Sequence, residues 1–314
     1  MARILTLTLN PAIDLTLALE HLSPGEVHRA SRMHRHAAGK GINVAQALGD
    51  LGHEIVVGGF LGSDNAADFD ALFAQRGWTD VFVRVPGETR SNVKVVEQDG
   101  RNTDLNSPGF HVSAEAAETL MAGLDAWAAQ VDAVLFCGSL PGGLTPEWLQ
   151  RAIERVKRIN ARVALDTSGA ALAAGVCAAP WLIKPNMEEL MQAFGTSAPT
   201  GATAQDLARA LVAQGVENVV VSDGAAGVSW WRGDGAWHAQ TPRVVVQSTV
   251  GAGDTLLAAM VHGLLRQAAS PDVLRHAAAC GTYAVTHVGF GLSAPERVAD
   301  IEAAVEVTAL RTTP

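Results

Sequence analysis

The sequence predicts an α/β fold with a mostly parallel central sheet and helices on both of its faces. Short β-branched or aliphatic runs alternate with longer segments whose apolar residues recur at helical spacing. This alternation is typical of strand–helix–strand units. The chain has 314 residues, 48% of them hydrophobic, which is enough to bury the core of one large domain or two smaller ones.

The expected strands and helices follow in chain order. Buried strands are predicted at 3–9, 53–60, 132–137, 162–167, 181–185 and 218–222. Helices are predicted at 42–52, 114–130, 146–160 and 204–215, and another is predicted to begin near Asp254. The paired residues Trp230 and Trp231 are expected in the core or at a sheet edge.

Two stretches do not follow the alternation of strands and helices. Residues 13–36 and 88–109 alternate polar with apolar positions and have no helix between their strands. This pattern indicates antiparallel ribbons with one solvated face. We interpret them as a small sheet that projects from the main domain as a lid; ordinary surface hairpins are the alternative.

Composition narrows the class of partner. The formal net charge is −9 and no lysine or arginine run interrupts it, so we expect neither a nucleic-acid partner nor a membrane surface. The three cysteines form no C-x-x-C pair, which argues against a disulfide framework or a zinc site. With no signal-like or membrane-spanning apolar run, we expect a cytoplasmic protein.

The turn Gly251-Ala252-Gly253 precedes Asp254 and an apolar helical stretch. Free amides at a helix N-terminus bind phosphate, and glycines let the phosphate approach the backbone. Asp254 has two interpretations: an N-cap, or a base that takes a hydroxyl proton beside a bound phosphate. A similar turn at 36–52 places Lys40 between two glycines and Asn43 in the first helical turn.

Neither turn matches the common nucleotide fingerprints. A Walker A loop needs G-x-x-x-x-G-K-[ST], and a dinucleotide site needs G-x-G-x-x-G. Thr255 and Leu256 follow Asp254 instead. A P-loop NTPase and a nicotinamide dehydrogenase are therefore disfavoured.

Five motifs together resemble the PfkB, or ribokinase-like, family of carbohydrate kinases. They are "NPAID", "AAGKGINVAQAL", "CGSLPGG", "KPNMEEL" and "STVGAGDT", and they occur in the family's order over nearly the whole chain. The resemblance implies a single kinase domain over residues 1–314, folded as a three-layer α/β/α sandwich with a small antiparallel β lid. It also implies a homodimer formed through the lid.

The resemblance assigns roles around the acceptor sugar. Asp254 would be the catalytic base, and Gly251, Ala252 and Gly253 would form the anion hole. Asp14, Gly39 and Asn43 would bind sugar hydroxyls. Arg90, Lys40 and Ser139 would bind a phosphate already on the sugar, which suits a guanidinium fork.

The resemblance also assigns a nucleotide side. The expected ATP-binding residues are Lys184, Ser222, Gly224, Gly227, Ser248 and Thr249. Asn186 and Glu189, in an N-x-x-E motif, would hold Mg²⁺ through water, and the same pair can form a capping box. The adenine is expected between residues 222–227 and 286–291. Asp223 departs from the family pattern, in which an apolar residue is common, and places a charge near the expected triphosphate.

The implied reaction is phosphoryl transfer from ATP, as co-substrate with Mg²⁺, to a phosphosugar. Fructose 1-phosphate is the expected acceptor, and tagatose 6-phosphate and fructose 6-phosphate are the close alternatives. A non-catalytic sugar or nucleotide sensor is a further alternative, disfavoured because Asp254 is present. A nucleoside kinase is disfavoured by Arg90 and Lys40, which a neutral acceptor does not need.

Overall fold

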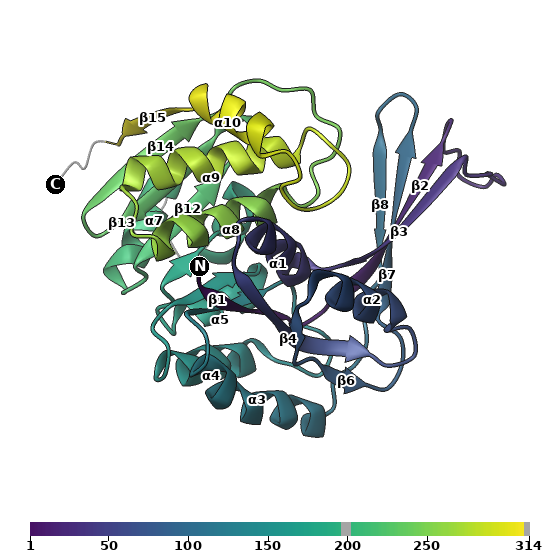
Figure 1. The fold of residues 1–314 in the computed structure, drawn as a ribbon, viewed down its shortest axis with the longest axis horizontal. Coiled ribbons are helices and arrows are strands. Elements are labelled where there is room, and N and C mark those ends of the chain that lie inside the picture. The colour runs from purple at the N-terminus through teal and green to yellow at the C-terminus, as the bar shows by residue number, and fades with distance from the viewer. Residues whose placement is uncertain (196–201, 311–314) are drawn as a thin grey trace.

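The computed structural model describes residues 1–195 and 202–310, which form a three-layer α/β/α body with a second, smaller sheet projecting from it (Figure 1). The eleven-stranded central sheet has the order β15-β14-β13-β12-β11-β10-β9-β1-β4-β5, with β6 paired to the end of β4. The strands from β12 to β5 run parallel, and β13, β14 and β15 extend one edge antiparallel.

The central strands agree with the buried runs in the sequence. Their bounds are β1 Arg3–Thr8, β4 Glu54–Gly62, β5 Thr79–Asp80, β6 Val83–Val85, β9 Ala133–Cys137, β10 Val163–Asp166, β11 Leu182–Ile183, β12 Asn218–Ser222, β13 Val228–Arg232, β14 Gly235–Gln240 and β15 Glu306–Ala309. Strands covered on both faces need apolar residues at every position, which explains why these runs do not alternate. The hairpin β13–β14 buries Trp230 and Trp231, which confirms the core placement of this pair.

Helices cover both faces of the central sheet. Their bounds are α1 Lys40–Asp50, α2 Ala67–Arg76, α3 Ala114–Ala128, α4 Pro146–Lys157, α5 Gly169–Val176, α6 Met187–Phe194, α7 Ala204–Ala213, α8 Ala252–Leu265, α9 Ser270–Ala284 and α10 Pro295–Ala303. One buried cluster joins the sheet to α1, α2, α8, α9 and α10, and a second joins it to α3 through α7. The predicted arrangement of helices on both faces is therefore confirmed.

Local signals fix where the helices begin. Thr145 caps α4, because its hydroxyl accepts a hydrogen bond from the amide of Trp148, and Pro146 occupies the first helical turn. Arg155 and Lys157 in the last turn oppose the negative end of the helix dipole. Burial of the apolar face of α4 against the sheet then completes its stabilisation.

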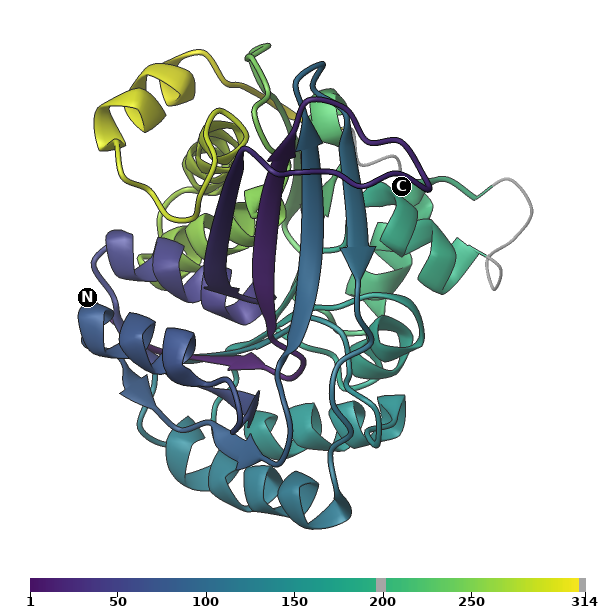
Figure 2. The same ribbon diagram turned by 90° about the vertical axis from the view of Figure 1, so that its right-hand side faces the viewer.

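The projecting sheet is built from the two stretches predicted as a lid. Its strands are β2 Ala12–Leu19, β3 Arg32–Ala38, β7 Arg90–Glu97 and β8 Asn102–Asn106, in the order β3-β2-β7-β8. Each stretch forms an antiparallel hairpin, and the two hairpins join through parallel pairing of β2 with β7 (Figure 2). The sequence pattern predicted the hairpins but not which strands would pair between them.

The two faces of this lid sheet differ in polarity. One face carries Asp14, Thr16, Asn92 and Lys94 and lines a cavity of about 360 Å³ between the lid and the main body. Strand alternation places Leu15, Leu17, Met33, Val93, Val95 and Leu105 on the other face. Met33 and Leu105 are 66% and 59% exposed, so part of this apolar face is uncovered.

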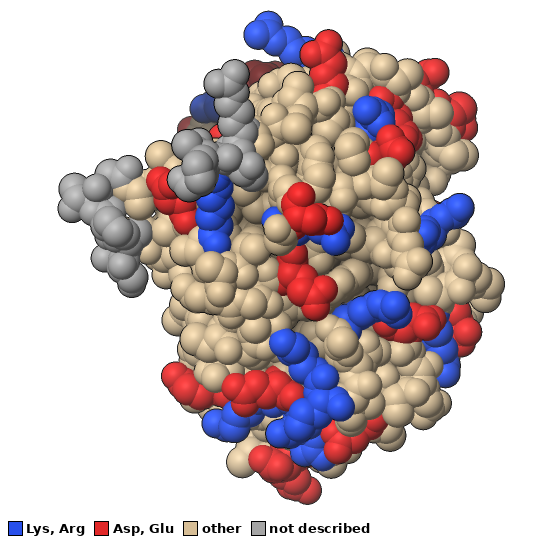
Figure 3. Space-filling model, turned by 90° about the vertical axis from the view of Figure 1, so that its left-hand side faces the viewer, with Lys and Arg blue, Asp and Glu red and all other residues tan. Residues whose placement is uncertain are grey.

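The surface away from the lid carries charges of both signs, interspersed rather than gathered (Figure 3). Within the described ranges, no helix is long and apolar enough to cross a membrane. The cysteines are all free thiols: Cys137 and Cys280 are buried, and Cys177 is exposed.

Candidate active site

The candidate active site lies at the carboxyl edge of the central sheet, where several elements converge. Asp166 ends β10, Lys184 follows β11, and Gly251 begins α8. Lys40 opens α1, on the same side of the sheet. These residues line one cavity of about 500 Å³ together with Asp254. Crevices at this edge are the usual ligand sites of open α/β sheets.

The glycine turn sets the start of α8. Gly251 is the N-cap with a φ of 80°, and Ala252 and Gly253 are the first helical residues. Asp254 is therefore the third helical residue, so the N-cap interpretation of Asp254 is wrong. This left-handed backbone angle favours glycine, and a Cβ at Gly251 would also crowd the Phe290 ring at 3.1 Å. The first amides of α8 have no intrahelical acceptor.

Asp254 is buried, and its carboxylate accepts a 2.8 Å hydrogen bond from Asn43 Nδ2. Burial, reinforced by repulsion from Asp166, raises the pKa of Asp254 to about 6. Lys40, Asn43 and Lys184 oppose this rise because they favour the charged form. The carboxylate is thus ionised at neutral pH and is a stronger base than an ordinary aspartate.

Asp166, which the sequence analysis did not single out, links the two lysines of the site. Its Oδ1 lies 2.9 Å from Lys40 Nζ, and its Oδ2 lies 3.5 Å from Lys184 Nζ. Burial opposes ionisation of Asp166, but the two ammonium groups outweigh it and lower its pKa. Burial also opposes the charge on Lys40, yet Asp166, Asp254 and Glu189 raise its pKa overall. The only signal in the sequence was a lone acid ending an apolar strand.

Lys184 lies against the anion-binding turn. Its side chain is 4% exposed, and a Cβ added to Gly253 would lie 3.1 Å from Lys184 Nζ. The absence of a side chain at residue 253 therefore lets the ammonium approach the amides of α8. A cation and free amides at one point form a strong site for a phosphate.

Asn186 and Glu189 form the capping box of α6. Asn186 Oδ1 accepts from the amide of Glu189 at 2.7 Å, and Glu189 Oε2 accepts from the amide of Asn186 at 2.9 Å. Glu189 Oε1 is left to face Lys40 Nζ at 3.6 Å. Among the described residues no three His, Cys, Asp or Glu side chains gather as metal ligands. One available carboxylate oxygen fits a hydrated Mg²⁺, whose remaining ligands are water and phosphate, and not a closed metal site.

The remaining predicted acceptor residues also line this cavity. Asp14 accepts a 3.1 Å hydrogen bond from Asn92 Nδ2, and burial raises the pKa of Asp14 despite that bond. Ser139 Oγ accepts from Asn10 Nδ2 at 3.2 Å. Gly39, the N-cap of α1, has a φ of 133° and lines the cavity with its backbone. Asn10 and Asn92 were not predicted as site residues, and the structure adds both.

Arg90 begins β7 at the base of the lid. Its guanidinium donates to the carbonyls of Asn10, Pro11 and Ser107, at 3.2, 3.4 and 2.9 Å. Burial lowers the pKa of Arg90, and Asp14 partly opposes this effect. Three of its five N–H groups are engaged by these carbonyls, which leaves donors for a ligand.

Four buried oxygen atoms of residues around this cavity have no hydrogen-bond partner among the described residues. They are Asn10 Oδ1, Asn43 Oδ1, Asn92 Oδ1 and Thr167 Oγ1. Unpaired buried acceptors are costly and rare in folded proteins, so their clustering needs an explanation. A ligand rich in hydroxyl groups would supply the missing donors.

A second cavity, of about 750 Å³, adjoins the first. The predicted residues Ser222, Gly224, Gly227 and Thr249 line it, and Ser222, Thr249 and Gly253 line both cavities. Lys184 lines only the first of these two. Ser248 lines neither; its hydroxyl accepts from the amide of Val250, and its side chain lines the cavity under the lid.

The wall of this second cavity differs from the expected one. The wall opposite the loop at 222–227 is formed by α9 and its C-cap, through Ala278, Gly281, Thr282 and Val285. Val288, Gly289 and Phe290, from the stretch expected to contact adenine, line the cavity under the lid instead. Asp223 is exposed and is not part of the wall, so its charge does not enter the cavity.

Comparisons with known proteins found relatives over nearly the whole chain. The model of the pfkB family carbohydrate kinases matches residues 7–297. The chain is 42% identical over 308 residues to the 1-phosphofructokinase of Vibrio cholerae, covering 98% of this chain and 97% of that one. It is 41% identical to the Escherichia coli 1-phosphofructokinase, covering 97% and 98%. The tetrameric inhibited form of E. coli phosphofructokinase-2 superposes with a TM-score of 0.87 at 27% identity, covering 97% and 99%.

Proposed function

Because the chain belongs to the pfkB family of carbohydrate kinases, we propose that it transfers the γ-phosphoryl group of ATP to the free primary hydroxyl of fructose 1-phosphate. The products are fructose 1,6-bisphosphate and ADP. The relatives named above support a phosphosugar as the acceptor class.

The observation that carries this proposal is the ring of unpaired oxygens in the cavity that holds Asp254. A polyol acceptor can donate to cavity-lining side chains such as Asn43 and Asn92, whose Oδ1 atoms have no partner, and a hydrophobic acceptor cannot. Asp14 and Gly39 line the same cavity and would complete the contacts to the sugar hydroxyls.

The cations of the site divide between the acceptor phosphate and the transferred phosphoryl group. Arg90 and Ser139 would bind the phosphate already on the sugar, and the carbonyl bonds to Arg90 hold its fork in place. Lys40 was predicted to help them, but its ammonium is paired with Asp166 and lies near Glu189. We therefore assign Lys40 to the transferred group, beside Lys184.

ATP would occupy the 750 Å³ cavity, with its adenine between the loop at 222–227 and α9. The triphosphate would then cross the boundary formed by Ser222, Thr249 and Gly253, because these residues line both cavities. The amides of Ala252, Gly253 and Asp254 and the ammonium of Lys184 would stabilise the charge on the transferred phosphoryl group.

The chemical step needs an oriented hydroxyl more than a strong base. The primary hydroxyl oxygen bonds to the γ-phosphorus while the bond from the γ-phosphorus to the β–γ bridging oxygen breaks, and ADP leaves. Asp254 accepts the hydroxyl proton, and the hydrogen bond from Asn43 keeps its carboxylate aimed at the acceptor.

Magnesium would be held through water by Glu189 Oε1, with Asn186 beside it in the capping box. When bound, the ion neutralises charge on the phosphates and orients them. Since Glu189 also lies near Lys40, the water-bound ion and the lysine would lie on the same side of the transferred group.

The lid would close over the acceptor and exclude water, which suppresses ATP hydrolysis. Its outer apolar face, with Met33 and Leu105 uncovered, suits pairing with the lid of a second copy. We therefore place the homodimer contact on this face of the lid. We also place the protein in the cytoplasm.

Initial rates with fructose 1-phosphate, fructose 6-phosphate and tagatose 6-phosphate test the acceptor assignment. The expected result is the highest kcat/KM on fructose 1-phosphate. A higher kcat/KM on either 6-phosphate would replace the acceptor, and turnover of none of the three would reject a phosphosugar kinase.

A further inference from the structure

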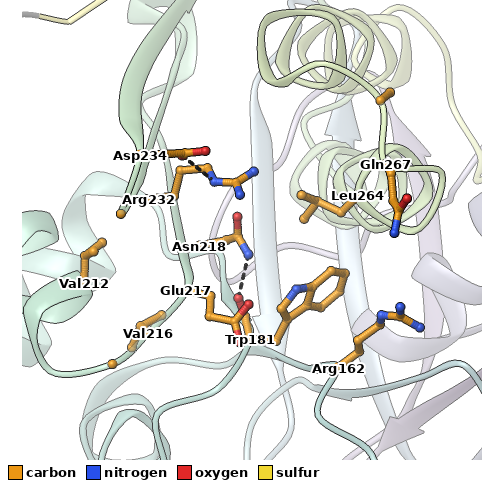
Figure 4. A pocket seen from close by; sticks show the side chains of 13 residues that line it. Arg162, Trp181, Val212, Val216, Glu217, Asn218, Arg232, Asp234, Leu264 and Gln267 are labelled. Carbon is orange, nitrogen blue, oxygen red and sulfur yellow. Dashed lines mark hydrogen bonds and ion pairs between the residues drawn. The ribbon is translucent and has the colours of Figure 1, made fainter.

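A third cavity, of about 700 Å³, lies at the opposite edge of the central sheet from the active site (Figure 4). Arg162 and Trp181 stand just before β10 and β11, and Asn218 opens β12. The turn between β13 and β14 and the C-terminal end of α8 close the other sides. Its volume is in the range of small-molecule sites.

The floor of this cavity is apolar but carries one unpaired donor. Trp181, Val212, Val216 and Leu264 supply the apolar surface. Trp181 is 8% exposed, and its indole N–H has no hydrogen-bond partner among the described residues, although its carbonyl accepts from Asn218. Indole N–H groups in buried tryptophans usually have a partner, so this one is available to a ligand.

Four charged side chains surround the floor, and only two of them form an ion pair. Arg232 and Asp234 pair at 2.7 Å, and Arg232 also lies over the Trp230 ring. The side chains of Arg162 and Glu217 have neither an ion-pair nor a hydrogen-bond partner within the described part of the chain. They line the same cavity on either side of the Trp181 indole (Figure 4), and present one free positive and one free negative charge to it.

We propose that this cavity binds a small zwitterion with an apolar body, that is, a free amino acid with a large apolar side chain. Arg162 takes the carboxylate as a fork, and Glu217 takes the ammonium group. The apolar side chain rests on Trp181, Val216 and Leu264. A dianion such as a sugar phosphate fits less well, because Glu217 and Asp234 oppose a second negative charge.

The position of the cavity connects it to the active site without overlapping it. Residues at or beside the ends of β10, β11 and α8 line it here, and the opposite ends of these elements carry Asp166, Lys184 and Asp254. Arg162 and Glu217 are exposed, so substitution of either leaves the core and the catalytic residues unchanged.

Binding of 4-fluoro-L-phenylalanine, followed by ¹⁹F NMR, tests the proposal. The full chain is held with ADP and fructose 1-phosphate, so that the other cavities are occupied. We expect saturable binding to the unmodified protein, and roughly tenfold weaker binding to each of Arg162→Gln and Glu217→Gln. Arg158→Gln, an exposed arginine that does not line the cavity, is the matched control and keeps full affinity.

Two analogues separate a zwitterion site from a simpler one. 3-(4-Fluorophenyl)propanoate lacks the ammonium group and 2-(4-fluorophenyl)ethylamine lacks the carboxylate, and each is expected to bind roughly tenfold more weakly. Absence of saturable binding at about 10 mM probe, far above typical small-molecule affinities, would overturn the proposal. The proposal would also be overturned if the propanoate bound as tightly as 4-fluoro-L-phenylalanine. It would be overturned as well if both cavity variants bound the amino acid as tightly as the control variant does.

Discussion

The candidate active site has two halves: the centre at the carboxyl edge of the main sheet, and the lid sheet. The two halves differ in how deeply their charged residues are buried and in what holds them in place. In the centre, Asp166 and Asp254 are buried, and two lysines balance their charges. In the lid, Asp14 and Lys94 stand on strands that are half exposed, and hydrogen bonds from Arg90 to three backbone carbonyls help to anchor the base. Under the proposed function, the rigid body performs the transfer and the lid selects and encloses the acceptor.

The largest effect is expected from Asp254→Asn. Loss of the base should lower kcat by about 10³-fold or more while ATP binding measured by calorimetry is retained. The pKa of Asp254 lies above its unfolded value of 3.8, so the ionised carboxylate costs folding stability above pH 6. The variant should therefore gain about 3 kcal/mol in free energy of unfolding at pH 8.

The control for this change is Asp272→Asn, at an exposed acid paired with Arg275 on α9. It should leave kcat unchanged. Near-normal turnover by Asp254→Asn would remove the base assignment and, with it, the division of roles between centre and lid.

Arg90→Gln tests the lid side of the comparison. We expect KM for fructose 1-phosphate to rise about 30-fold, and kcat to change much less, because a charge-assisted contact to the acceptor phosphate is lost. Arg151→Gln, on the exposed face of α4, is the control. A fall in kcat with unchanged KM would instead place Arg90 in the transfer step.

The pH dependence of kcat tests the centre, because the pKa of Asp254 is set there. Because Asp254 must be ionised to accept a proton, kcat should fall about tenfold per unit as pH drops below 6. Asp166→Asn removes the negative charge that raises this pKa, so the acid limb should move to lower pH even though kcat also drops. An acid limb that stays in place would show that burial alone sets the pKa of Asp254.

The smallest effect concerns assembly. Met33→Glu with Leu105→Glu places charge on the uncovered apolar face of the lid, and light scattering should report the mass of a monomer instead of a dimer. Met191→Glu, at a 39% exposed methionine on α6, should leave the mass unchanged. A dimer that survives the lid change would move the contact elsewhere.

The sequence predicted the elements with strong periodicity. The runs at 3–9, 132–137 and 218–222 became β1, β9 and β12, because strands buried on both faces must be apolar throughout. The glycine turns at Gly39 and Gly251 also lie where a helix begins. The antiparallel edge β13–β15 was not predicted, since its alternation is short and its pairing depends on the strand beside it.

Part of the candidate site was predicted as well, because some of its residues belong to local sequence motifs. Asp254, Lys40, Asn43 and Glu189 belong to motifs that a chain displays locally, and the structure brings all four around one cavity. Asp166 and Asn92 belong to none of the quoted motifs, and Asn10 belongs to a motif in which only Asp14 was given a role. Their distances to Lys40, Asp14 and Ser139 reveal them.

By itself, the sequence determined the alternation of strands and helices, the two glycine turns and the class of chemistry that they serve, because backbone conformation and hydrophobic periodicity are local properties. Tertiary structure alone decided that β2 pairs parallel with β7, that Asp166 holds two lysines, and that Asp254 has a raised pKa. The physical reason is that charge interactions, burial and strand pairing depend on distances between segments far apart in the chain.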